Sequence, residues 1–297
     1  MWPPPAAVIV LAIVGFSVAA PLVRTSHADP LAIAAWRLAL SLPIIAMLLL
    51  PGRGWRQWRT LDRRALGLCV ASGVALALHF WAWNVSLGLT SVAASVVLVD
   101  CHPVIVALCS ALWLGERPTR AQWAGILAAL AGAMLIAAGD LRIDALASSR
   151  RAVLGDLLAL AGAVAVAMYY LAGRRLRQRL DLWPYVGLVY GVALVVLVCI
   201  AGARHVPLWP QPPREMAIFA GLALGPMLLG HTGMNWALRY LPAFVVSVAV
   251  LGEPVGASLL AAALPWIHEV PPAATLAGGA LVLAGIALAL PRAAPAP

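Results

Sequence analysis

The chain has no lysine. All 20 of its basic residues are arginine, and only 10% of its 297 residues are charged, whereas a soluble domain carries about 25% charged residues. With 63% hydrophobic residues and a mean hydropathy of +0.95, the sequence predicts a polytopic membrane protein. Because a Walker phosphate-binding loop needs lysine, an ordinary one is excluded, and we expect neither ATP hydrolysis nor a cofactor.

Cysteine is also scarce. The four cysteines all lie in apolar segments and form no CxxC pair, so the sequence supports neither a disulfide framework nor a metal site. A net charge of +9 is compatible with nucleic-acid binding, but the arginines stand in short connections between apolar runs. We therefore interpret them as topology signals, and expect the lipid bilayer and no nucleic acid as a partner.

Long apolar runs dominate what remains. A bilayer-spanning helix needs about 20 mostly apolar residues, and dividing the chain at its arginine, proline and glycine clusters gives ten such segments. The predicted spans are 6–23, 30–50, 65–86, 91–113, 121–139, 153–172, 183–202, 215–235, 242–264 and 273–290.

The arginines are unevenly divided between the two ends of these spans. With the N-terminus inside, the cytoplasmic connections and C-terminal tail hold 13 arginines and the opposite side holds 6, while Arg37 lies within the second span. This bias predicts that both chain termini are cytoplasmic.

The sequence contains an internal repeat. Asn84 and His102-Pro103 recur as Asn235 and Glu253-Pro254, with the same spacing from asparagine to proline in both copies. Each copy holds five spans, an odd number, so the second must enter the membrane inverted relative to the first. The predicted fold is an all-α membrane protein of two inverted five-helix repeats, residues 1–145 and 146–297, with a substrate site near the midplane.

A motif between the fourth and fifth spans resembles a known family. The sequence Leu114-Gly115-Glu116-Arg117-Pro118-Thr119 follows the intrahelical Pro103 and precedes a glycine-spaced helix. This pattern resembles the EamA domain of the drug/metabolite transporter superfamily, and Leu251-Gly252-Glu253-Pro254 resembles its second copy. That second copy departs from the pattern at His268-Glu269-Val270, where the first has Gly115-Glu116-Arg117.

The resemblance implies a ten-span secondary transporter of the bacterial inner membrane that exports or exchanges small metabolites. Within the superfamily, the segment His79-Phe80-Trp81-Ala82-Trp83 is similar to aromatic amino acid exporters.

Polar residues inside the spans are the candidates for substrate binding, because buried charge is costly in a membrane. Arg37 could pair with a substrate carboxylate, pair structurally with Asp100 or Glu253, or extend toward the interface. Helical spacing in the third span and the matching stretch of the second repeat indicate two candidate walls of the substrate cavity, and packing between helices is the alternative role for each. They are His79, Trp83 and Ser86 in the third span, and His231 and Asn235 in the eighth.

The fourth and ninth spans hold the candidates for proton coupling or gating. Asp100 and His102 stand about 200° apart on a continuous helix, so we expect only one of them to face the cavity. Pro103 removes a backbone hydrogen bond and predicts a kink, for gating or for packing. Glu253-Pro254 is the repeat of His102-Pro103, and Glu253 could bind a proton or an amine, or bond across helices.

The leading functional interpretation is a transporter that exports amino acids, aromatic or otherwise bulky and apolar, by alternating access. Alternatives are export of a nucleoside, sugar or quaternary amine and, less favoured, a channel or an intramembrane enzyme. An enzyme would need a nucleophile beside a base, or closely spaced metal ligands, and the sequence shows neither. Proton coupling and passive transport both stay open, as do a monomer and a homodimer.

Overall fold

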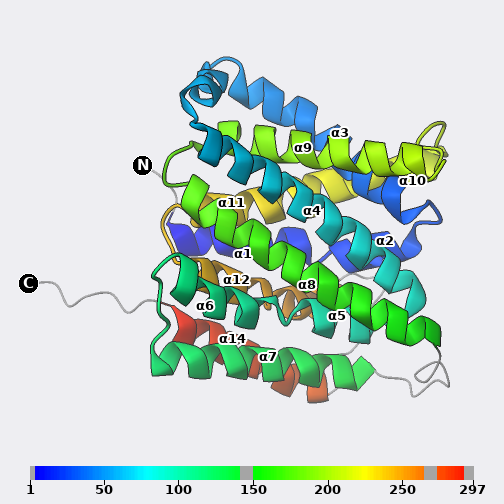
Figure 1. Cartoon of the computed structure of the whole chain (residues 1–297). Coiled ribbons are helices and arrows are strands. Elements are labelled where there is room, and N and C mark those ends of the chain that lie inside the picture. Colours follow the sequence, from blue (N-terminus) through cyan, green and yellow to red (C-terminus); the bar gives the residue numbers. More distant parts are fainter. Residues whose placement is uncertain (1–3, 141–149, 264–272, 291–297) are drawn as a thin grey trace, which may run out of the picture.

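The computed structural model describes residues 4–140, 150–263 and 273–290. Nine of the described helical spans are long and apolar enough to cross a membrane, and Ala273–Ala289 is a shorter apolar tenth. The ten-span, all-α prediction is confirmed (Figure 1). In chain order the spans are α1 Pro5–Phe16 with α2 Ala19–Thr25, α3 Pro30–Leu49, α4 Arg63–Leu89, α5 Val92–Val99 with α6 His102–Trp113, α7 Arg120–Asp140, α8 Arg150–Leu176, α9 Leu182–Ala203, α10 Pro213–Leu222 with the π-helix η3 Ala223–His231 and α11 Thr232–Ala237, α12 Ala243–Val250 with α13 Glu253–Ala263, and α14 Ala273–Ala289.

Short polar side chains begin several of these helices. Asp29 accepts a hydrogen bond from the backbone N–H of Leu31 at the start of α3, and Asp62 accepts one from Ala65 at the start of α4. Ser91 caps α5 in the same way. Each cap satisfies a backbone donor that has no partner within its own helix, and so fixes where the span starts.

The two halves pack span against span. α3 lies on α9, α6 on α12, and α7 on α14, so the second, fourth and fifth spans each contact their own repeat mates. α1 of the first span packs on η3 of the eighth span, and α4 of the third span packs on α8 of the sixth. The first and third spans thus each contact the repeat mate of the other. This pattern is what a pseudo-two-fold axis in the membrane plane requires, and it makes the halves an inverted pair.

The α7–α14 pair is the closest of these contacts. A Cβ atom on Gly132 would lie 2.6 Å from the carbonyl oxygen of Gly278, and one on Gly125 would lie 2.6 Å from that of Gly285. Glycine at these positions lets the two backbones touch. The small-residue face around Gly125 therefore joins the two halves of one chain.

One end of the bundle, called here the arginine-rich end, is tied by polar contacts between four connections. The Glu116 carboxylate accepts a hydrogen bond from Arg174 Nε at 2.6 Å and one from the backbone N–H of Ala243 at 2.9 Å. Arg239 pairs with Asp181 at 2.7 Å. The Leu-Gly-Glu-Arg-Pro motif thus links the first half to the ends of α8 and α12. The predicted repeat boundary at 145/146 and the His268-Glu269-Val270 segment lie outside the described residues.

Candidate functional site

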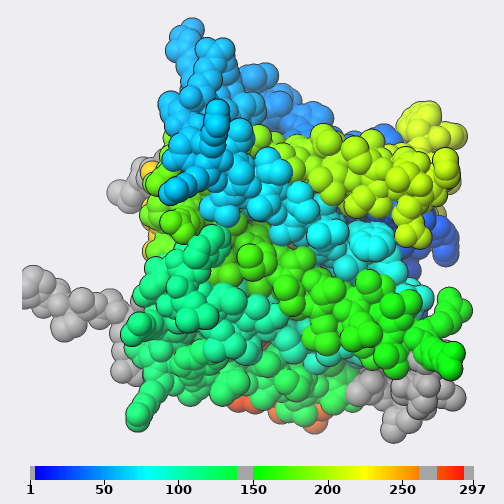
Figure 2. Space-filling view, in the orientation of Figure 1, coloured from blue at the N-terminus to red at the C-terminus, as the bar shows by residue number. Residues whose placement is uncertain are grey.

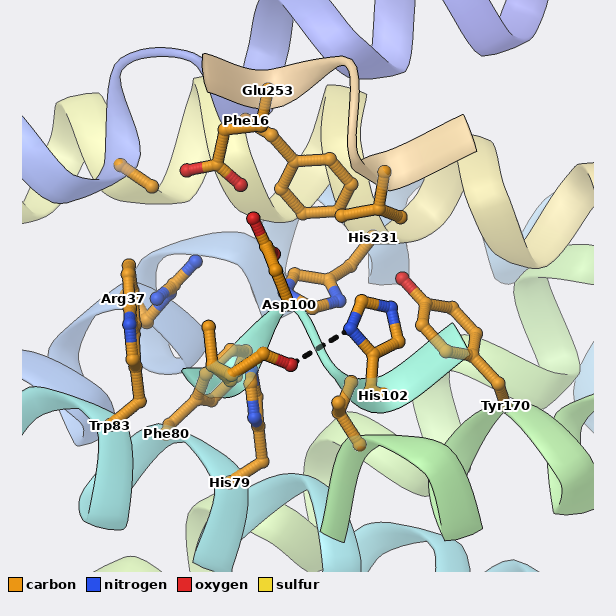
Figure 3. A pocket seen from close by; sticks show the side chains of 14 residues that line it. Phe16, Arg37, His79, Phe80, Trp83, Asp100, His102, Tyr170, His231 and Glu253 are labelled. Atoms are coloured by element: carbon orange, nitrogen blue, oxygen red, sulfur yellow. Dashed lines mark hydrogen bonds between the residues drawn. The ribbon is translucent and has the colours of Figure 1, made fainter. Parts of the chain in front are cut away.

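A cavity of about 50 Å³ lies between the two halves, and seven of the predicted site residues line it (Figure 3). Aromatic and aliphatic side chains complete its wall. The predicted residues are Arg37, His79, Trp83, Asp100, His102, His231 and Glu253, and the others are Phe16, Ala19, Phe80, Val99, Val166, Tyr170 and Val250.

Interruptions in the spans converge on this cavity. The first span breaks between Phe16 and Ala19, the fourth between Val99 and His102, and the ninth between Val250 and Glu253, and all six residues line the cavity. The eighth span contains a π-helix that ends at His231. Non-helical backbone at membrane depth is tolerated where it lines a cavity or is buried in protein, and π-helical stretches are frequent at functional sites.

The break in the fourth span corrects one expectation. Asp100 and His102 were expected to face different directions, yet both line the cavity. Asp100 and Cys101 form a turn that interrupts the α-helix between α5 and α6, so the 100° step per residue of a continuous helix does not hold there. Pro103 stands in the first turn of α6, immediately after the predicted kink, where its missing N–H costs no hydrogen bond.

Arg37 is the most deeply buried cation of the cavity wall, with 1% of its surface exposed. Its guanidinium carbon stands 4.1 Å from the centroid of the Phe80 ring. Its Nε and Nη1 atoms have no hydrogen-bond partner within the described residues, and it forms no ion pair there with Asp100 or Glu253. A stacked but unpaired guanidinium keeps donors available for an anionic group.

Other buried polar atoms of the cavity wall also lack partners within the described part of the chain. They include Asp100 Oδ2, His102 Nε2, His231 Nδ1 and Trp83 Nε1. Buried polar atoms are normally hydrogen-bonded, and each exception calls for an explanation. Six of the twelve such atoms among the described residues belong to Arg37 and these four side chains of the cavity wall, and they include donors and acceptors.

Hydrogen bonds and ring contacts fix the histidines. His79 Nδ1 lies 3.0 Å from the carbonyl oxygen of Gly162, and His102 Nδ1 lies 3.0 Å from that of Val99. A carbonyl only accepts, so Nδ1 carries the proton in both rings, and Nε2 of a neutral ring is an acceptor. His79 stacks on Trp83 with an interplanar angle of 2°, and this contact orders both rings.

Four predicted residues do not line the cavity. The Ser86 hydroxyl is bound to Ser95 Oγ at 2.5 Å, which turns it into the interface between α4 and α5. The Asn235 amide donates to Tyr169 Oη and to the carbonyl of His231, one turn away from the cavity. Pro103 and Pro254 adjoin it through the backbone, next to His102 and Glu253.

Some lining residues were missed as site residues by the sequence reasoning. Tyr170 stacks on His102 with ring centroids 5.8 Å apart. Phe16 touches the edge of His231 at 4.8 Å. The only signal for Phe16 is its place in Gly15-Phe16-Ser17, a small-polar interruption of an apolar run. Among the described residues, no group of three His, Cys, Asp or Glu side chains could hold a metal ion.

A family of known proteins matches the chain twice, once in each half. The sequence profile of the EamA-like transporter family matches residues 4–138 and 153–290. A protein of Streptantibioticus cattleyicolor named "Probable terminal-alkyne amino-acid exporter" is 28% identical over 285 residues, which cover 94% of this chain and 91% of that protein. A "Pseudopaline exporter" of Pseudomonas aeruginosa is 30% identical over 226 residues, 75% of this chain and 74% of that protein.

A solved crystal structure with 21% sequence identity has a TM-score of 0.76 and covers 96% of each chain, so the fold is shared. Two profile matches, one to each half of a ten-span helical bundle, identify the chain as a multi-pass membrane protein that belongs to the EamA-like transporter family.

Proposed function

We propose that this protein is a secondary transporter that exports amino acids, aromatic or otherwise bulky and apolar, across the bacterial inner membrane. The observation that carries the proposal is the charge arrangement of the cavity. Arg37 offers unpaired donors, and Asp100 and Glu253 bring two carboxyl groups into the same cavity (Figure 3). A zwitterion with a carboxylate and an ammonium group matches both.

Each part of an amino acid has a partner in this arrangement. Its carboxylate would accept hydrogen bonds from Arg37, since a guanidinium binds planar anions by two parallel bonds. Its ammonium group would lie beside Asp100 and Glu253, with His102 Nε2 as a further acceptor. An apolar or aromatic side chain would pack against Trp83, Phe80 and Tyr170.

The relatives support export of small molecules. One is named as an exporter of an amino acid and another as an exporter of pseudopaline. At 28% and 30% identity these names support the class of function, export of a small molecule. The substrate is therefore proposed from the residues of the cavity. Transport, rather than catalysis, is the function these relatives favour.

The size of the cavity favours alternating access. At about 50 Å³ it has room for only a few waters, since one water needs roughly 10–15 Å³ of such volume. An amino acid is larger, so it would enter only after the halves move apart on one side. The inverted packing of α1 on η3 and α4 on α8 supplies two equivalent seams for such a motion.

We further propose that both chain ends are cytoplasmic, because the connections on the same side of the bundle as the ends hold the excess of arginine. We also propose that Asp100 and Glu253 couple transport to protons. Their carboxyl groups face one cavity with little else to neutralise them. Facilitated transport without coupling is the alternative.

A second candidate function is export of an organic cation such as a quaternary amine. It is favoured by the two carboxyl groups that line the same cavity as Trp83, since aromatic faces attract such cations. It leaves Arg37 without a ligand group, which is why the zwitterion is preferred.

Counterflow in proteoliposomes tests the proposal. Vesicles loaded with unlabelled phenylalanine, leucine, a nucleoside or a quaternary amine would receive the labelled compound outside, with and without a pH gradient. We expect accumulation of the amino acids. Uptake of nucleosides or cations without any amino acid would refute the leading function, and a rate independent of the gradient would remove the coupling role of Asp100 and Glu253.

A further inference from the structure

The connection between α3 and α4 concentrates positive charge at the arginine-rich end. It contains five exposed arginines within one short segment, three of them in or beside the 3-10 turn η1 (Gly54–Thr60). In Figure 2 this segment, light blue, stands out from the rest of the molecule beside the ends of the spans. The five are Arg53, Arg56, Arg59, Arg63 and Arg64.

The protein's own carboxylates do not neutralise these arginines. Three carboxylates stand at this end of the described chain, and each already has another arginine. Asp62 pairs with Arg179, Glu116 with Arg174, and Asp181 with Arg239. None of the five arginines forms an ion pair among the described residues. The charge surplus at this end is therefore free to act on a partner outside the protein.

The η1 turn is held in place against α9. Gln57 donates to the Asp181 carboxylate at 2.7 Å and accepts from the Asp181 backbone N–H at 3.0 Å. Trp58 Nε1 donates to the carbonyl of Pro184 at 2.9 Å. These contacts present the segment in one orientation, so a partner would not bear the cost of ordering it.

Aromatic contacts order two of the arginine heads. The guanidinium carbons of Arg56 and Arg59 lie 5.8 and 5.0 Å from the ring centroid of Trp55. Tryptophan rings favour the headgroup level of a bilayer, and an arginine held against such a ring keeps its hydrogen-bond donors free in the plane of the guanidinium.

We propose that the segment of Arg53, Arg56, Arg59 and Trp55 binds the phosphate groups of anionic phospholipids in the leaflet at the arginine-rich end. Guanidinium groups form bidentate bonds with phosphate oxygens, and arginine clusters beside a membrane span attract anionic lipid. A role limited to setting topology would need the positive charge alone. It would need neither the docked turn nor the stacked guanidinium groups.

Footprinting of the unmodified protein tests this directly. The purified transporter is reconstituted into phosphatidylcholine vesicles with or without phosphatidylglycerol, and arginine modification by phenylglyoxal is followed by peptide mass spectrometry. We expect phosphatidylglycerol to slow modification several-fold at Arg53, Arg56 and Arg59. Exposed Arg150 and Arg151 at the opposite end serve as the internal control, with little change expected.

Two footprinting results would overturn the proposal. Equal protection of the control arginines would mean general charge accumulation at the vesicle surface. Equal protection by inorganic phosphate in phosphatidylcholine vesicles would mean a site for free anions instead of lipid.

A second measurement uses variants. Native mass spectrometry would count phosphatidylglycerol molecules retained by Arg53→Gln/Arg56→Gln/Arg59→Gln and by the matched control Arg150→Gln/Arg151→Gln/Arg204→Gln. Each arginine near a charged bilayer contributes about five-fold, so we expect retention weakened on the order of 10²-fold in the first variant alone. Similar loss in both variants, or in neither, would contradict the proposal. If the first variant fails to insert, the footprint of the unmodified protein decides.

Discussion

Replacement of Arg37 by glutamine removes the one buried cation of the cavity while keeping a shorter side chain with a planar polar group. In the proposed site the guanidinium makes two hydrogen bonds to the substrate carboxylate. A hydrogen bond to a charged group contributes about 1.5–3 kcal/mol. The loss of two such bonds, partly offset by the glutamine amide, predicts a rise in the dissociation constant on the order of 10²-fold.

Substrate analogues make the prediction specific to the carboxylate. Equilibrium binding of phenylalanine and of its methyl ester would be measured for the unmodified protein and for Arg37→Gln, with Arg204→Gln as an exposed control. The unmodified protein should discriminate strongly against the ester, which lacks the anionic oxygen, and Arg37→Gln should not. Arg37→Lys keeps the charge but loses the planar fork, so an intermediate loss of roughly 10-fold is expected. If Arg37→Gln binds both ligands as the unmodified protein does, the assigned role is refuted.

Three further changes test the packing, the arginine-rich end and the aromatic wall. In Gly132→Ala the new Cβ would lie 2.6 Å from the carbonyl oxygen of Gly278, so we expect a loss of about 1–3 kcal/mol of stability in thermal unfolding. Gly191→Ala, which meets nothing within 4 Å, should be neutral, and equal effects would contradict the close contact. The hydrogen bond from Gln57, and next to it that from Arg239, holds the pKa of Asp181 below its usual range. The ionised carboxylate therefore stabilises the fold above pH ~4, and this contribution is lost as the pH falls further. Asp181→Asn should therefore unfold up to about 1 kcal/mol more easily at pH 7 and match the unmodified protein at acidic pH, whereas a deficit that grows with acidification would exclude this reasoning. Trp83→Ala should weaken aromatic substrates by roughly 3–10-fold and spare aliphatic ones, and normal transport of phenylalanine by this variant would count against the stacking wall.

Much of the scaffold could be predicted from sequence because the bilayer imposes its own length scale. Apolar runs of about 20 residues gave the ten spans, and their odd number per repeat gave the inverted packing. The repeated X-Pro pairs marked the interruptions of the fourth and ninth spans. In the structure these lie two and three residues ahead of Pro103 and Pro254.

The composition of the cavity wall was harder to predict. Helical spacing assumes a continuous helix, and a two-residue turn between α5 and α6 is enough to bring Asp100 and His102 to the same wall. The break after Phe16 is not marked by a repeated X-Pro pair, although Pro21 follows three residues beyond its end. Periodicity grouped Ser86 with Trp83 on one face of α4, but in the structure the Ser86 hydroxyl is hydrogen-bonded to Ser95 and does not line the cavity.

The arginines illustrate the same limit. Their positions in sequence predicted one basic end, and the structure joins the connections at that end through Glu116 and Asp181. Which arginines are paired depends on tertiary contacts that no local pattern encodes. The direction of the bundle in the membrane stays a prediction.

A structure of the protein with a bound amino acid would test the central claim most directly. The account predicts the ligand in the cavity between the halves, with its carboxylate within hydrogen-bond distance of the Arg37 guanidinium and its ammonium group beside Asp100 and Glu253. A ligand bound outside this cavity, or one whose carboxylate points away from Arg37, would contradict it.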